Sequence, residues 1–266
     1  MLTVIQHGNN INSIQNALKE KEEDVLIAKF LPDLINNSYL PGLHYKKKIL
    51  TIIACHSNNE LRYNATVNNI NYINFINNDI VIVNSLDEPY SKKLKETVQN
   101  VVKDYIEIPN DDCLDIGKWC RGLRHYDYRK YDFVVFLNDS LVIKNSIRHF
   151  YNKMIRRNLE LYGYNDSSIA NYHYQSYLFG VRQDAVIKLI KFFLIKKPTL
   201  HSYEDVVYKI ELNLTKIFET KDCFLKIAHL KSNYFKNIYF NNPGFYAKLF
   251  SSGLLPFVKL KQLSQY

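Results

Sequence analysis

The sequence predicts an α/β protein built on an open, mainly parallel, twisted sheet with helices on its faces. Two observations favour this fold class. From residue 48 onward, apolar runs of strand length alternate with helix-length segments, and several of these runs end abruptly on small polar or acidic residues. Repeated βα units of this kind form doubly wound sheets, whose active sites lie beyond the carboxyl ends of the strands.

The alternation of apolar patterns gives the expected order of elements. Strands are expected at residues 48–57, 79–84, 105–108 and 133–137, with helices between them at 59–76, 92–102 and 114–126. The pattern is less regular from residue 147, where the expected elements are helices near 147–159, 184–195 and 203–218 and a strand over 174–181.

The chain has no Pro/Gly-rich linker after residue 48, so residues 48–266 are expected to form a single domain with halves at 48–146 and 147–266. Residues 1–47 are expected to form a helical extension packed on this domain, with helices at 11–22 and 25–36.

The composition is that of a globular protein that stays in a reducing compartment. The 266 residues are 47% hydrophobic, which is ample for a large core. The net charge of +9 is dispersed in short groups, so we expect a solvated surface and no nucleic-acid partner. Four cysteines without CxxC pairs or zinc spacing, and the lack of a leader pattern or a bilayer-length apolar run, favour a soluble, cytoplasmic protein.

Two predicted strands end on polar residues that should meet at one edge of the sheet. These residues are Cys55, His56 and Ser57 at the end of the first strand and Asn138, Asp139 and Ser140 after the fourth. A buried strand that ends on a carboxylate between small polar side chains is how open α/β sheets build nucleotide and metal sites. Asn-Asp-Ser is also a common turn or helix-capping sequence, so the tripeptide alone leaves both interpretations open.

The segment before the fourth strand, DDCLDIGKWCRGL, contains the chain's only tryptophan. Asp115 and Lys118 are three residues apart and share a helix face, while Trp119 and Leu123 form the adjoining inward stripe. On spacing alone, a helix anchored by its tryptophan and a functional site are equally good interpretations.

The second half of the chain holds two more groups of polar residues. Gln175 and Ser176 follow His173 and interrupt an aromatic strand pattern, where polar groups either satisfy one another in the core or line a pocket for hydroxyl-rich ligands. Glu204 and Glu211 are seven residues apart and share nearly the same face of the expected helix. Helix carboxylates are usually solvated, so this pattern is weak by itself.

Six phrases of the sequence occur together in a fixed order. They are DIGKW with GL (115–123), YD to LNDS (131–140), HYQSY (173–177), ELNLT (211–215), NP (242–243) and GLLPFVK (253–259). In these phrases the chain resembles the glycosyltransferases of the rhamnan synthesis F type, GT-A-like enzymes of polysaccharide assembly, over roughly residues 48 to 260. Six phrases in one order argue against chance.

The resemblance implies a GT-A-like fold and transfer of a sugar, rhamnose or another deoxyhexose, from a UDP-, GDP- or dTDP-sugar to a glycan hydroxyl in polysaccharide biosynthesis. The resemblance also implies that residues 48–146 form the half that binds the nucleotide sugar and that residues 147–266 form the half that binds the acceptor. The implied donor-binding residues are Cys55, His56, Ser57, Asp115, Lys118, Arg121, Asn138, Asp139 and Ser140. The implied contacts to sugar hydroxyls are His173, Gln175 and Ser176. For the base of an inverting mechanism the candidates are Glu211, then Asp205 and Glu204. A retaining mechanism stays open.

Asp139 takes the place of the acidic motif that in GT-A enzymes touches the donor's ribose or a divalent ion, Mn²⁺ or Mg²⁺. The usual motif is Asp-x-Asp and this chain offers one carboxylate there, so metal dependence stays open. Without a metal, Lys118 and Arg121 would have to stabilise the leaving diphosphate.

The alternative function is a non-catalytic basic module that binds glycan or nucleic acid, which would explain charge and tyrosines but not Asp139 together with the later polar groups. For the basic, aromatic residues 234–261, packing on the core is preferred to peripheral contact with a membrane. The sequence carries no signal for the oligomeric state.

Overall fold

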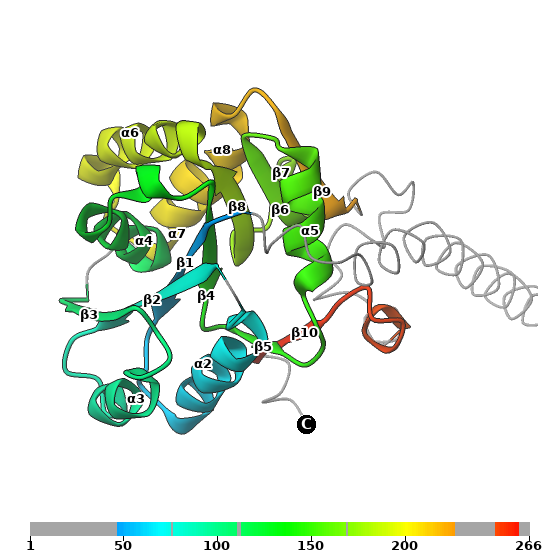
Figure 1. The fold of residues 1–266 in the computed structure, drawn as a ribbon. Helices are drawn as coiled ribbons and strands as arrows, with labels where there is room; N and C mark the ends of the chain where they lie inside the picture. Colours follow the sequence, from blue (N-terminus) through cyan, green and yellow to red (C-terminus); the bar gives the residue numbers. More distant parts are fainter. Residues whose placement is uncertain (1–46, 76, 111–112, 169, 227–247, 261–266) are drawn as a thin grey trace, which may run out of the picture.

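A computed structural model gives the fold, drawn in Figure 1. It describes residues 47–75, 77–110, 113–168, 170–226 and 248–260, so the expected N-terminal extension and its two helices lie outside the described residues. The described residues form an eight-stranded sheet with the order β3-β2-β1-β4-β8-β6-β7, in which β9 also pairs with β6. No helix in these ranges is long and apolar enough to cross a bilayer.

The first four strands are parallel neighbours: β1 Ile49–Cys55, β2 Asn78–Ser85, β3 Asp104–Ile108 and β4 Phe133–Asn138. Beside β4, the antiparallel β8 (Leu178–Arg182) leads to β6 (Leu161–Ser167) and β9 (Lys221–Leu225), which run parallel to each other. The expected mainly parallel α/β sheet is therefore confirmed. Every residue of β1 and β4 is buried, as expected for strands covered on both faces.

Helices cover both faces of the sheet, and β1 shows how its side chains divide between them. Ile49 and Ile53 point into one core, which α2 (Glu60–Ile73), α3 (Ser91–Val98) and α5 (Arg148–Arg157) close. Leu50 and Ile52 point into the other, which α4 (Leu114–His125) and α6 (Val186–Lys196) close. The alternation follows from the two-residue period of a strand. Figure 1 shows α4 and α6 together with α7 and α8 on one side of β1.

The single strand expected over 174–181 is wrong, because the chain forms two strands there, β7 (His173–Tyr174) and β8. Both pair with β6, but in different registers: Asp166 pairs with Tyr174 and Gly163 with Phe179. In the strand order β6 lies between β8 and β7, so residues 175–177 connect two strands that pair with different sides of β6. Gln175 and Ser176 lie in this connection.

The helix expected over 203–218 is present, but it changes type along its length. It consists of α7 (Tyr203–Asp205), the π-helix η5 (Val206–Glu211), α8 (Leu212–Leu214) and the 3₁₀ turn η6 (Thr215–Ile217). The side chain of Ser202 caps its start by accepting from the N–H of Asp205 at 3.1 Å. Single π turns inside helices are frequent at functional sites.

Four strands were not expected from the sequence: β5 (Leu141–Ile143), β6, β9 and β10 (Phe257–Lys259). β10 pairs with β5 in a separate two-stranded sheet, with Lys259 opposite Leu141. This pairing brings the end of the GLLPFVK phrase next to the polar end of β4.

Candidate functional site

A cavity of about 610 Å³ lies at the carboxyl edge of the parallel strands. It brings together predicted residues from both halves of the chain: His56, Asp115, Lys118, Asn138, Ser140, His173, Gln175, Ser176 and Glu211. The strand order places it at the point where the chain, after moving outward through β1, β2 and β3, returns to the other side of β1 with β4. Ligands of open α/β sheets bind at such switch points.

Asp139 is held directly after β4 by three interactions. Its N–H donates to the carbonyl of Ala54 at 3.1 Å, which extends the pairing of β4 with β1. Carboxylate Oδ2 accepts from the N–H of His56 at 2.6 Å, and Oδ1 forms an ion pair with the guanidinium of Arg62. The side chain is 2% exposed and does not itself line the cavity. A carboxylate this deeply buried is stable only when it is paired and hydrogen-bonded.

Helix α4 presents a charged pair to the cavity and an aromatic anchor to the sheet. The Trp119 indole N–H donates to the carbonyl of Leu137 at 3.1 Å, and its ring packs against Phe136 and Phe179. On the cavity side, the Lys118 ammonium donates to the carbonyl of Cys55 at 2.7 Å. The interpretation of Trp119 as the anchor of this helix is therefore confirmed, whereas the functional role of Asp115 and Lys118 stays a prediction.

Asp115 is the carboxylate on the cavity side of α4. Its Oδ2 accepts from the Asn138 amide at 2.9 Å. Burial raises the pKa of Asp115 to about 6, and the negative charge of Asp139 adds to the rise, while Lys118 lowers it. Glu211 also contributes to the raised pKa, which places that carboxylate within electrostatic reach of Asp115.

Of the three residues predicted at the end of the first strand, only His56 lines the cavity. Its Nδ1 lies 2.9 Å from Ser85 Oγ and 3.1 Å from Glu88 Oε1, and burial lowers the pKa of the imidazole. The thiol of Cys55 points into the core, where burial raises its pKa. Ser57 is buried in hydrogen bonds with Asn84.

Three other predicted residues lie away from the cavity. Arg121 donates to the carbonyl of Pro109 at 3.2 Å. Asp205 forms an ion pair with Lys209 at 2.5 Å, and Glu204 is exposed. Among the candidate bases, only Glu211 therefore lines the cavity.

Two cations of the cavity were not found from the sequence. Arg62 lies in the first turn of α2, three residues after the N-cap Asn59, so it reaches back over the ends of β1 and β4. The sequence signal that could have identified Arg62 is its position in the first turn of the helix that follows β1. Lys259 is the last residue of the GLLPFVK phrase, and its ammonium lies 4.4 Å from the ring centroid of Tyr177.

Exposed aromatic side chains lie on the helical side of the cavity. Tyr203 and Tyr208 line it while remaining 65% and 62% exposed. Partial burial raises the pKa of Tyr203, and the charges of Glu211 and Asp115 add to the rise, so the phenol is within electrostatic reach of both carboxylates. Exposed tyrosines beside carboxylates give the cavity an amphipathic wall that suits a sugar ring.

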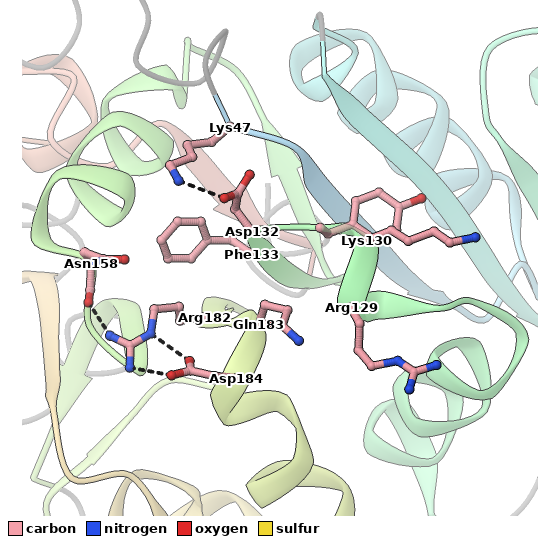
Figure 2. A pocket seen from close by; sticks show the side chains of 10 residues that line it. Lys47, Arg129, Lys130, Asp132, Phe133, Asn158, Arg182, Gln183 and Asp184 are labelled. Carbon is pink, nitrogen blue, oxygen red and sulfur yellow. Dashed lines mark hydrogen bonds and ion pairs between the residues drawn. The ribbon is translucent and has the colours of Figure 1, made fainter.

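A second cavity, of about 480 Å³, lies at the opposite edge of the sheet (Figure 2). It is basic, and two of its cations form ion pairs with carboxylates of the same cavity. Lys47 pairs with Asp132 at 2.8 Å, and Arg182 pairs with Asp184 at 2.7 Å. These residues flank the starts of β1 and β4 and the end of the antiparallel β8, away from the polar strand ends. The candidate site is therefore the cavity at the carboxyl edge.

Comparisons with known proteins give limited similarity. No protein-family model matches the chain. It is 28% identical over 136 residues to "Virulence protein VirA" of Vibrio anguillarum, including that of strain ATCC 68554 / 775, a match that covers 47% of this chain and 43% of VirA. The chain thus spans less than half the length of the curated relatives it matches. The resemblance to the rhamnan synthesis F type stays a prediction.

Solved structures with a similar arrangement include glycosyltransferases. Staphylococcus aureus TarS has a TM-score of 0.49 at 10% identity and covers 66% of this chain and 35% of TarS. A putative nucleotide-diphospho-sugar transferase from Desulfovibrio desulfuricans G20 has a TM-score of 0.44 at 12% identity, and the match covers 77% of this chain and 95% of that protein. GlyE of Streptococcus pneumoniae TIGR4 has a TM-score of 0.44 at 11% identity, and the match covers 66% of this chain and 45% of GlyE. All three TM-scores are below 0.5, so the function is argued from the site.

Proposed function

We propose that this chain is a glycosyltransferase that moves a sugar from a nucleotide-sugar donor to a hydroxyl of a glycan acceptor. The observation that carries the proposal is a single cavity at the switch point of the sheet. This cavity joins the polar ends of β1 and β4 to a carboxylate, Glu211, of the π-helical segment. A transferase needs a donor-binding group and a catalytic base in the same cavity, because the donor and the attacking hydroxyl must meet in one place.

The donor is proposed to lie along the carboxyl ends of β1 and β4. Its nucleoside lies beside His56, and its diphosphate lies between Lys118 and the ion pair of Arg62 with Asp139. Asn138 and Ser140 complete this side of the cavity, with Ser140 Oγ donating to Asn138 Oδ1 at 2.6 Å. The resemblance makes a rhamnose or other deoxyhexose nucleotide the first donor to try.

The acceptor is proposed to enter beside the π-helix and the connection between β7 and β8. His173, Gln175 and Ser176 offer hydrogen-bonding groups at that side, and Tyr203 and Tyr208 offer exposed rings. Glu211 takes the proton of the acceptor hydroxyl as its oxygen forms the new bond to the anomeric carbon. The bond from that carbon to the donor phosphate breaks, and the nucleoside diphosphate leaves with the bonding electrons.

The test is release of nucleoside diphosphate from a panel of UDP-, GDP- and dTDP-sugars, with and without manganese. Wild type, Asp139→Asn and Glu211→Gln are compared, with Asp184→Asn at the opposite edge as a control. We expect Asp139→Asn to abolish donor binding or turnover, Glu211→Gln to bind donor but transfer slowly, and Asp184→Asn to behave as wild type. If no sugar nucleotide binds to or is turned over by the wild type, the proposal is wrong.

A further inference from the structure

We infer that this site neutralises the donor's diphosphate with Arg62, Lys118 and Lys259 rather than with a divalent metal ion. The inference rests on the proposed function and concerns how the same cavity holds its donor. Mn²⁺ and Mg²⁺ at such sites are bound by one or two carboxylates together with the substrate phosphates. The first question is therefore whether the carboxylates of this cavity can take such an ion.

Asp139 does not suit this role, because both of its oxygens are engaged. Oδ2 accepts the N–H of His56 at 2.6 Å, and Oδ1 is paired with Arg62. A divalent ion at Oδ1 would lie against the positive guanidinium, and this repulsion is large in a site where the carboxylate is 2% exposed. The guanidinium already occupies the side from which an ion would approach.

Asp115 is no better suited. One of its oxygens accepts the Asn138 amide, and the Lys118 ammonium is close enough to lower its pKa. In the part of the chain that the structure describes, no group of three or more His, Cys, Asp or Glu side chains could hold a metal ion.

The cations of the cavity come from three separate elements. Arg62 is supplied by the first turn of α2, Lys118 by α4 and Lys259 by β10, and all three line the cavity. Lys118 is 4% exposed, and its ammonium donates a hydrogen bond to the backbone carbonyl of Cys55. A carbonyl carries no net charge, so this bond does not neutralise the ammonium. An ammonium has three N–H donors and this bond uses one, so the others can reach an anion.

Arg62 has the geometry to serve two anions at once. A guanidinium has five N–H donors in a planar fork and binds phosphate and carboxylate side by side. It can therefore keep its ion pair with Asp139 while it donates to a phosphate of the donor. The pair of Arg62 and Asp139 then performs the task of a metal bound to a carboxylate, which is to fix a positive charge beside the leaving diphosphate.

The experiment measures the affinity of UDP, GDP and dTDP by calorimetry, in EDTA and in manganese chloride. We expect the preferred nucleotide to bind equally well in both. Removing Arg62 leaves a buried charge on Asp139, so Arg62→Gln is compared with wild type and with Arg62→Lys, which keeps a positive charge beside Asp139 but lacks the planar fork. Loss of the guanidinium in Arg62→Gln should weaken binding in EDTA roughly 10- to 100-fold, the range of a charge-assisted hydrogen bond. Thermal unfolding checks that both variants are folded.

Lys118→Met and Lys259→Met should weaken binding in the same direction, while Arg129→Ala, at the opposite edge and 73% exposed, should bind as wild type. Two results would overturn the inference and leave the proposed function standing. They are wild-type binding that EDTA abolishes and manganese restores, or metal-free binding that is equal with and without Arg62. Failure of every nucleotide to bind in both buffers would instead overturn the proposed function, and the inference with it.

Discussion

The buried carboxyl of Asp115 makes a quantitative prediction about stability. Its pKa rises from 3.8 in the unfolded chain to about 6 in the fold, mainly because the side chain is buried. A carboxyl with a raised pKa binds its proton more tightly in the folded state, so its contribution to stability is present below pH 3.8 and is lost as the pH rises through 6. About two pKa units correspond to about 3 kcal/mol of unfolding free energy.

Asp115→Asn keeps the shape of the side chain and removes its titration. We therefore expect the variant to gain about 2 kcal/mol relative to wild type as the pH is raised from 4 to 7, the remainder of the effect lying below pH 4. The groups that set this value are the negative charges of Asp139 and Glu211 and the ammonium of Lys118. Urea unfolding at a series of pH values measures the difference, and Trp119, the chain's single tryptophan and a buried one, reports it by fluorescence.

Asp184→Asn is the control, because its titration has the opposite sign. The ion pair with Arg182 lowers the pKa of Asp184, so its contribution is present above pH 3.8 and is lost on acidification. Its side chain is 60% exposed, so solvent screening should keep the effect below about 1 kcal/mol. A difference between Asp115→Asn and wild type that stays constant from pH 4 to 7 would refute the reasoning.

Three further substitutions probe how the site is supported. Gly122→Ala should lower stability by about 1–3 kcal/mol in thermal unfolding, because its new Cβ would lie 3.0 Å from Ile52 Cγ2 in the contact of α4 with the sheet; unchanged stability would contradict this packing. Trp119→Phe should cost about 1–3 kcal/mol through the lost hydrogen bond to Leu137, measured by urea unfolding followed by circular dichroism. Tyr203→Ala should raise the acceptor KM severalfold and spare nucleotide affinity, whereas Tyr203→Phe should keep the wild-type KM; a loss of nucleotide affinity would place the ring on the donor side.

The parallel half of the fold could be predicted because its strands are buried on both faces. A run such as ILTIIAC in β1 has no polar face, so it stands out from the helical patterns around it. The missed strand β6, LYGYNDS, contains Gly163 and ends on three polar residues. Its small residue serves a packing need, since a Cβ at Gly163 would lie 3.0 Å from the side chain of Tyr174. That need exists only once the two strands are paired.

The difference between local patterns and contacts made only in the folded chain also explains which site residues could be predicted. Asn138, Asp139 and His56 could be placed because a strand end fixes their position along the chain and the parallel order fixes the edge where they meet. Arg62 and Lys259 depend instead on contacts between distant segments. One crosses from α2 to the end of β4, 77 residues away, and the other requires the pairing of β10 with β5. Single cations in a chain with 35 Lys and Arg residues carry no sequence signal of their own.

The charges on the donor side of the cavity favour a ligand that brings negative charge with it. Asp139 is offset by Arg62, and Asp115 is partly offset by Lys118, so these four groups are close to neutral together. Lys259, from β10, adds a positive charge whose ammonium lies over the Tyr177 ring, and Glu211, from the π-helix, adds a negative charge on the acceptor side. A diphosphate would find donors from three separate elements of one cavity, whereas a neutral glycan alone would give these cations no anionic partner. The cavity is therefore better matched to a phosphorylated donor together with a glycan than to a glycan by itself, which is the difference between a transferase and a binding module.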